Sequence, residues 1–225
     1  VSNVSLGQPV VNDSKGCGTV MRVSPIGLMY EGELAYRLGK KTSQLTHGHP
    51  TATVSAGALC LIINQLKQGV SLEQAIASSL DIVKNDEKQL NIHNETSQAI
   101  ERALSFAKQG ESTSAEQVEK LGAGWIAEEA LAISLYCALV AHDFSHGVLL
   151  AVNHSGDSDS TGSITGNLLG MIYGQSGIPS HWKDQLELRE VIEQIAFDLA
   201  DIPRNFVSDG DDDYHSKVIN RYPGY

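Results

Sequence analysis

The sequence predicts an all-α fold, and three observations support that prediction. Apolar residues recur at three- and four-residue steps through most of the chain. Alternation of β-branched with polar residues, which is typical of strands, is scarce, and several periodic segments begin with a proline or a capping residue. Because the chain has 225 residues and a mass of 24.2 kDa, we expect one domain over residues 1–225.

The first three predicted helices cover residues 25–39, 50–69 and 71–85. Pro25 and Pro50 stand at the first positions of the first two, where a helix makes no use of the backbone N–H that proline lacks. The second helix is apolar on most faces, which predicts that it lies at the centre of the fold. A Ser-x-x-Gln capping box opens the third.

The second half of the chain continues the helical pattern. Residues 109–124 are typical of a polar connection with at most one short helical turn, and residues 209–225 of a charged, turn-rich tail in solvent. The further helices are expected over 94–108, 125–142, part of 143–160, 161–173 and 183–202.

The composition limits the partners and the compartment. A formal net charge of -11 and a pI near 5.1 argue against nucleic acid or an anionic membrane as the main partner, because both are polyanions. The three cysteines are widely spaced and form no CxxC pair, which favours a reducing compartment. Since no membrane span and no signal peptide can be recognised, we expect a soluble, cytoplasmic protein. The initial valine indicates that upstream chain has been removed.

The stretch "NHSGDSDSTGSITGNLLG" places Asp157 and Asp159 two residues apart, just ahead of a helix rich in small residues. Neighbouring carboxylates repel each other unless a cation neutralises them, and carboxylate and hydroxyl oxygens suit Mg²⁺, Mn²⁺ or Ca²⁺. Two interpretations stay open at this point: a metal site that includes Ser160, or a polar loop that caps the helix. The glycines in the helix cost about 1 kcal/mol each, which indicates close approach of a ligand or another backbone.

Two further segments carry polar chemistry. The loop "NDSKGCGTVMR" could turn backbone N–H groups toward a phosphate, with Arg22 to supply charge, or could be a structural turn. The segment "THGHP" supplies His47 and His49, which could contact a substrate, cap the turn or bind zinc. Zinc is least favoured, because no third ligand stands at a suitable spacing. His154, beside the acidic stretch, has the same alternatives.

The order of these motifs resembles the ADP-ribosylglycohydrolase family. The segments "GCGTVMRVSPIGL", "THGHPTA", "GWIAEEALAISLYCAL" and "NHSGDSDSTGSITGNLLGMIYG" follow one another as in that family, over roughly residues 13–200. "GDSDST" is similar to the branch that hydrolyses ADP-ribosylarginine, which includes the dinitrogenase reductase-activating glycohydrolase. The resemblance implies a compact multi-helix orthogonal bundle with two divalent cations, Mg²⁺ or Mn²⁺, that hold the distal ribose of ADP-ribose. Asp157, Asp159 and Ser160 match the metal motif, and the two aspartates would act in catalysis.

The resemblance also implies a set of substrate-binding residues. His47 matches the histidine that faces the ligand. Trp125 is a looser match to an aromatic wall, because Lys15 stands where some relatives have a stacking tyrosine. The loop that follows the diphosphate and ribose is matched by Gly16, Cys17, Gly18, Thr19, Met21 and Arg22.

One part of the family pattern is missing. Relatives normally begin with a "GDALG"-like helix and an acidic Thr-Asp-Asp cluster that completes the metal site, and this sequence contains neither. We therefore expect either the C-terminal portion of a longer domain or a form with half a metal site. The first implies hydrolysis of the bond between ADP-ribose and a modified protein side chain, with arginine preferred. The second implies a non-catalytic immunity or regulatory protein that binds ADP-ribose or a cognate ADP-ribosyltransferase.

Overall fold

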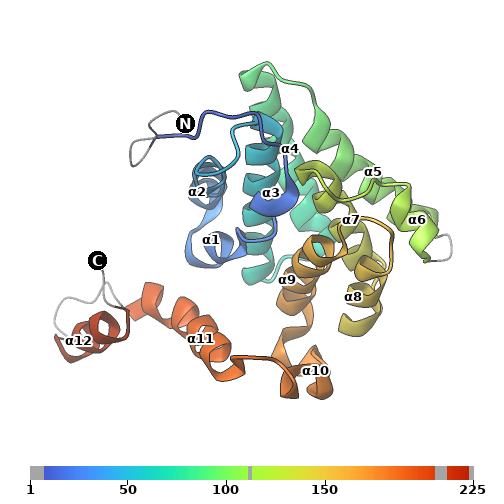
Figure 1. Cartoon of the computed structure of the whole chain (residues 1–225). Coiled ribbons are helices and arrows are strands. Elements are labelled where there is room, and N and C mark those ends of the chain that lie inside the picture. Colours follow the sequence, from blue (N-terminus) through green and yellow to red (C-terminus); the bar gives the residue numbers. More distant parts are fainter. Residues whose placement is uncertain (1–7, 111–112, 206–211, 223–225) are drawn as a thin grey trace. The chain divides into compact units, whose positions relative to one another are not determined.

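The computed structural model describes residues 8–110, 113–205 and 212–222, and the chain divides into two units, Val1–Ser180 and His181–Tyr225 (Figure 1). Over the described residues every regular element is a helix, and the only strand-like pairing is an isolated antiparallel bridge between Gly16 and Ile126. The all-α prediction is confirmed. The prediction of one domain over residues 1–225 stays a prediction, and the two units are described separately.

Helix α3 (Pro50–Lys67) forms the centre of the first unit (Figure 1). It is buried along nearly its whole length, and it packs against α1 (Ser24–Met29), α2 (Gly32–Ser43), α4 (Leu72–Leu90) and α7 (Ala127–Leu139). A helix that is apolar all round is stable only when other elements cover every face. The predicted central position of this helix is thus confirmed.

The predicted single helix over 25–39 is wrong, because the helix is interrupted between α1 and α2. Tyr30 is extended and Gly32 has a φ of 53°, a left-handed conformation that suits glycine. The Asn64 side chain, on α3, replaces the lost helical hydrogen bonds. Its amide donates to the Tyr30 carbonyl at 2.8 Å, and its oxygen accepts from the Gly32 N–H at 3.0 Å. Apolar periodicity alone could not indicate this break, since it continues across it.

The predicted starts of the next two helices, α3 and α4, are confirmed. Helix α3 begins at Pro50, and Gly69 follows its end with a φ of 83°. The Ser71 hydroxyl caps α4 by accepting from the Gln74 N–H at 3.4 Å. Helix α4 extends to Leu90, beyond the predicted end at residue 85.

The elements that follow agree with the sequence pattern in type and order. The polar connection contains the one short helix expected there, α6 (Ala115–Glu119). Earlier in the chain, before α1, the glycine loop contains a short 3₁₀ helix, η1 (Cys17–Thr19). The other helices of this half are α5 (Glu95–Gln109), α8 (Phe144–Val152) and α9 (Ser158–Gly177).

The second unit contains most of α10 (Ser180–Asp184), together with α11 (Arg189–Asn205) and α12 (Asp212–Arg221). One continuous helix over 183–202 is therefore wrong: Leu188, with a φ of 57°, separates α10 from α11. The turn-rich tail is also wrong over 212–221, which is helical, while 209–211 and 223–225 lie outside the described residues. Asp198 of α11 accepts from Arg221 at 2.8 Å and from the Tyr222 hydroxyl at 2.7 Å, which ties α12 to α11.

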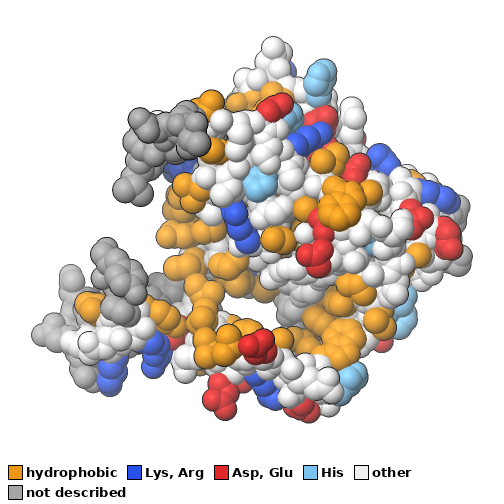
Figure 2. All heavy atoms as spheres, in the orientation of Figure 1, with side chains coloured by type: hydrophobic (Ala, Val, Ile, Leu, Met, Phe, Trp, Pro, Cys, Tyr) orange, Lys and Arg blue, Asp and Glu red, His pale blue; other side chains and the backbone are white. Residues whose placement is uncertain are grey.

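The surface adds two observations. On the face shown in Figure 2, the described acidic, basic and hydrophobic side chains are interspersed over the first unit. Within the described part of the chain, each helix is too short or too polar to cross a lipid bilayer.

Candidate functional site

The glycine loop around η1 is attached to the start of α7 through backbone hydrogen bonds. The Cys17 N–H donates to the Trp125 carbonyl at 3.1 Å, and the Ala127 N–H donates to the Lys15 carbonyl at 2.9 Å. This is the bridge between Gly16 and Ile126. The loop is therefore a fixed part of the fold.

The loop meets the start of α9 through the Cys17 side chain. Its thiol donates to the Asp157 carboxylate at 2.6 Å and lies 3.5 Å from the Ser160 hydroxyl. Ser160 in turn donates to the Met21 sulfur at 3.4 Å. Asp157 is only 5% exposed. Two motifs that are 140 residues apart in sequence thus form one polar cluster.

The turn before α9 places Asp157 by close backbone contact. The Asp157 N–H donates to the Ala123 carbonyl at 2.8 Å, and a Cβ atom on Gly156 would overlap that same carbonyl. His154 holds the turn from inside, because its Nε2 lies 2.9 Å from the Thr161 hydroxyl and its Nδ1 accepts from the Gly156 N–H at 3.1 Å. Of the alternatives open for His154, the structure supports a structural one.

The thiol and the carboxylate have complementary protonation states. Burial, together with the hydrogen bond to Asp157, raises the pKa of Cys17 to about 11, so the thiol stays protonated and donates. Burial also pushes the pKa of Asp157 upward. Hydrogen bonds with the Cys17, Asp159 and Ser160 side chains outweigh that effect and hold the pKa of Asp157 below its ordinary value. Asp157 is therefore a buried, ionised carboxylate at neutral pH.

The donor chemistry here fits a hard divalent cation. Asp157 and Asp159 supply carboxylates and Ser160 a hydroxyl, and Mg²⁺ is commonly bound by one or two carboxylates with water and substrate oxygens completing its shell. Asp159 is exposed to solvent, whereas Asp157 and Ser160 are buried. Within the ranges that the structure describes, no cluster of three or more His, Cys, Asp or Glu side chains is suited to a metal ion. Asp157, Asp159 and Ser160 therefore carry oxygen donors of the type that such a cation prefers.

His47 covers the glycines of the loop. A Cβ atom on Gly16 would lie 3.3 Å from the His47 Nε2, and one on Gly18 would lie 3.8 Å from the His47 ring. The His47 Nδ1 is 2.7 Å from the Thr46 hydroxyl, which also accepts from Arg22 at 2.6 Å. Burial, with the Arg22 charge as a second cause, lowers the pKa of His47, so the imidazole is neutral at pH 7.

The remaining predicted residues lie around this cluster in different ways. Met21 is 38% exposed, and Trp125 is 62% exposed while its carbonyl accepts from the Cys17 N–H. Thr19 is fully buried, so its side chain points away from any opening. His49 acts as the cap of α3, since its ring accepts from the Thr51 N–H at 3.2 Å. The residues that the structure brings together are Gly16, Cys17, Gly18, Met21, Arg22, His47, Asp157 and Ser160, with Asp159 at the rim.

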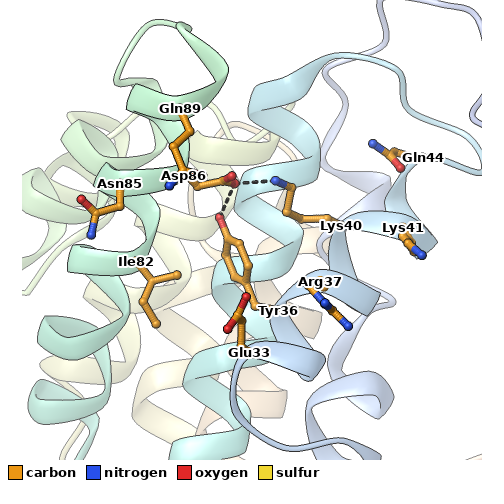
Figure 3. A pocket seen from close by; sticks show the side chains of 10 residues that line it. All are labelled: Glu33, Tyr36, Arg37, Lys40, Lys41, Gln44, Ile82, Asn85, Asp86 and Gln89. Carbon is orange, nitrogen blue, oxygen red and sulfur yellow. Dashed lines mark hydrogen bonds and ion pairs between the residues drawn. The ribbon is translucent and has the colours of Figure 1, made fainter.

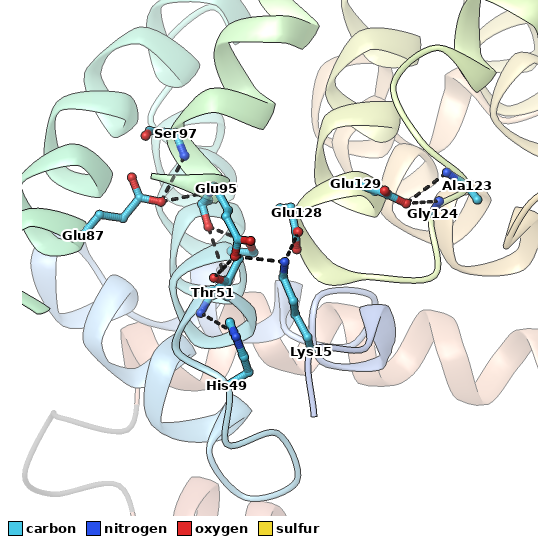
Figure 4. A network of polar contacts seen from close by, with 12 residues as sticks. Lys15, His49, Thr51, Glu87, Glu95, Ser97, Ala123, Gly124, Glu128 and Glu129 are labelled. Atoms are coloured by element: carbon cyan, nitrogen blue, oxygen red, sulfur yellow. Dashed lines mark hydrogen bonds and ion pairs between the residues drawn. The ribbon is translucent and has the colours of Figure 1, made fainter. Parts of the chain in front are cut away.

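A network of charges attaches the glycine loop to α5 and α7 through Lys15 (Figure 4). Sequence reasoning missed this network. The Lys15 ammonium binds Glu95 at 2.9 Å and also binds Glu128, while the Thr51 hydroxyl donates to Glu95 at 2.6 Å. Glu128 is 6% exposed, and its second oxygen has no hydrogen-bond partner among the described residues. Glu95 and Glu128 stand in the first turns of α5 and α7, where acidic residues are common for helix-dipole reasons alone. Because acidic residues are common at these positions, nothing in the sequence indicates that Glu95 and Glu128 share Lys15 as a partner.

Replacing Lys15 should destabilise the fold. Lys15→Met leaves the buried Glu128 carboxylate without its cation, and breaking a buried pair costs about 3 kcal/mol. Denaturant unfolding at pH 7 measures this loss. Burial pushes the pKa of Lys15 down, but the contacts with Glu128 and Glu95 outweigh burial and raise that pKa. Burial pushes the pKa of Glu95 up, but the hydrogen bonds from Thr51 and Lys15 outweigh burial and lower that pKa.

The shift directions define the pH window of this effect. The contribution of a raised Lys15 pKa is complete below 10.5 and disappears at higher pH, while that of a lowered Glu95 pKa is complete above 4.5 and disappears at lower pH. The difference between parent and Lys15→Met should therefore be largest between these limits and shrink outside them. Lys15→Met combined with Glu128→Gln should recover part of the stability. Equal stability of Lys15→Met and the parent at pH 7 would contradict the assignment.

Comparison with known proteins finds a matching family and several similar sequences. The sequence model of the ADP-ribosylglycohydrolase family matches residues 2–206. An uncharacterised protein from Archaeoglobus fulgidus is 30% identical over 202 residues, which cover 86% of this chain and 61% of that protein. ADP-ribosylarginine hydrolase Tri1 from Serratia proteamaculans is 24% identical over 189 residues, covering 83% of this chain and 47% of the relative.

A solved structure described as an ADP-ribosylglycohydrolase-related protein complex is 26% identical, with a TM-score of 0.64. The match covers 84% of this chain and 61% of the solved chain. This chain therefore spans about half to three-fifths of the length of the proteins that it matches. Because the family's sequence model extends over nearly the whole of it, the chain belongs to the ADP-ribosylglycohydrolase family.

Proposed function

We propose that this protein is a divalent-cation-dependent hydrolase that removes ADP-ribose from modified protein side chains, with arginine as the preferred linkage. The observation that supports it most directly is the cluster of Cys17, Asp157 and Ser160 beside the His47-covered glycine loop. A relative named ADP-ribosylarginine hydrolase supports the choice of arginine. Three free, buried cysteines fit a reducing compartment, and we place the protein in the cytoplasm.

Asp157, Asp159 and Ser160 would hold the cations, Mg²⁺ or Mn²⁺. When bound, such ions orient ribose hydroxyls and lower the pKa of a bound water. Asp157 is rigidly placed by the Gly156 turn and the Cys17 thiol, which suits a ligand that must not move during the reaction. Asp159 is exposed, so its carboxylate can face substrate and accept the proton of the attacking water.

The loop residues would bind the rest of the ligand. Gly16 and Gly18 lack side chains that would crowd the His47 ring over the loop, and the neutral His47 can donate or accept a hydrogen bond with a diphosphate there. The bond from the ribose C1 to the guanidine nitrogen breaks, and the hydroxyl of water joins C1. The nitrogen leaves with a proton. Nearby carboxylates stabilise the positive charge that develops on the sugar ring.

Hydrolysis of an ADP-ribosylated arginine peptide tests the proposal. We expect ADP-ribose and unmodified peptide to form in the presence of Mg²⁺ or Mn²⁺, and EDTA to stop the reaction. A matched peptide carrying ADP-ribose on serine should react more slowly. Release of ADP-ribose at the same rate with EDTA would exclude the cation dependence, and faster turnover of the serine peptide would exclude the arginine preference.

A second candidate is a protein that binds ADP-ribose, or a cognate ADP-ribosyltransferase, without turnover. It is favoured by the absence, among the described residues, of a metal group of three or more ligands. Calorimetry with ADP-ribose, with and without Mg²⁺, separates the candidates when combined with the hydrolysis assay. Tight binding without product supports the second candidate.

A further inference from the structure

A groove lined largely by charged and amide residues lies between α2 and α4, away from the cluster at Asp157. It has a volume of about 560 Å³, and Figure 3 shows the side chains that surround it. The floor holds a small network in which the Asp86 carboxylate accepts from the Tyr36 hydroxyl at 2.7 Å and from the Lys40 ammonium at 2.5 Å.

The charges of the groove are not balanced internally. Lys40 neutralises Asp86, but Arg37 and Lys41, one helical turn apart on α2, form no ion pair within the described part of the chain. Glu33 is the remaining acidic lining residue, so three cations face two carboxylates. This excess of positive charge occurs in a protein whose net charge is -11. An acidic partner is repelled by most of such a surface and attracted at this groove.

The groove and the candidate site share helix α2. Beyond its end at Ser43, the chain continues directly to Thr46 and His47. Arg22 of the glycine loop donates to the Thr42 carbonyl at 3.5 Å and to Thr46, which joins the end of α2 to the site. When the modified side chain of a protein substrate is bound at His47, substrate residues that flank it can therefore reach this groove.

We propose that the α2–α4 groove binds an acidic segment of the ADP-ribosylated protein substrate. Arg37 and Lys41 would pair with its carboxylates, and the side-chain amides of Gln44, Asn85 and Gln89 would bind its backbone. The groove is open and most of its lining residues carry a charge or an amide, which suits an extended peptide better than an enclosed apolar ligand. This inference rests on the proposed function, because it assigns the groove to that reaction's protein substrate.

The test compares two ADP-ribosylated arginine peptides, one with four flanking glutamates and one with four glutamines. We expect the parent to have a KM roughly 5-fold lower for the glutamate peptide at low salt, an advantage that fades as salt is added. Arg37→Glu combined with Lys41→Glu should abolish this advantage and leave turnover of free ADP-ribosylarginine unchanged. As a control, Lys88→Glu combined with Lys108→Glu reverses the same number of charges outside the groove and should retain it.

The outcomes separate this inference from the proposed function. A glutamate advantage that survives in the groove variant, or is equally lost in the control, overturns the groove assignment while hydrolysis stands. If the parent fails to cleave free ADP-ribosylarginine, the proposed function fails. Fluorescence anisotropy with the unmodified glutamate peptide then still tests the groove, where the parent should bind and the groove variant should not.

Discussion

Asp157→Asn is expected to lower both Mn²⁺ affinity and hydrolysis by at least about 100-fold, since even residues that only support metal ligands contribute 10–100-fold. The substitution removes the charge of the buried carboxylate but preserves its shape. The amide oxygen can still accept from the Cys17 thiol, now 2.6 Å from the Asp157 oxygen, so the fold should persist. Calorimetry with Mn²⁺ and the hydrolysis assay measure the two losses, and circular dichroism checks the fold.

Asp81→Asn is the matched control for this substitution. Asp81 is an exposed aspartate of α4, and the same loss of one charge there should leave binding and turnover unchanged. A general electrostatic effect would change both variants alike. If Asp157→Asn binds Mn²⁺ as tightly as the parent, Asp157 is not a metal ligand and the proposed mechanism is wrong.

Gly156→Ala is expected to cause the other large effect, because the new methyl group has no space. A Cβ atom at Gly156 would overlap the backbone carbonyl of Ala123, and this carbonyl also accepts from the Asp157 N–H at 2.8 Å. The two loops must then separate. Steric overlap of this kind costs about 2–3 kcal/mol, and it should displace Asp157 from Cys17 and weaken cation binding. Thermal unfolding and Mn²⁺ calorimetry measure the two effects.

Gly166→Ala provides the opposite result in the following helix. An added Cβ at Gly166 meets nothing within 4 Å, and the residue lies inside α9. Alanine is the better helix former by about 1 kcal/mol, so this variant should be as stable as the parent or more so. If Gly156→Ala is as stable as Gly166→Ala, the close approach to Ala123 does not determine the position of Asp157.

The local signals in the sequence predicted the helices well where those signals act within one turn. Pro50 starts α3, and the Ser71 hydroxyl caps α4 as its capping box indicates. These effects depend on a few neighbouring residues, and so a single sequence contains them. The break at Gly32 was missed because its backbone groups are satisfied by Asn64, which lies on another helix.

The same distinction holds for the candidate site. Composition and spacing identified the carboxylates at Asp157 and Asp159, and the order of motifs connected them with the glycine loop. Neither could indicate that the Cys17 thiol donates to Asp157, or that Lys15 lies between Glu95 and Glu128. In sequence, Lys15 stands out only as a residue that differs from a tyrosine of some relatives.

The sequence by itself determined that this protein is helical, where several helices begin, and which residue types are available for phosphate and cation chemistry. Only the tertiary structure decided which of those residues meet, since packing against α3 and α7 brings the glycine loop to the start of α9. The physical reason is the distance along the chain over which the interactions act. Capping and periodicity act over three or four residues, whereas contacts between distant segments depend on how all the buried faces pack together.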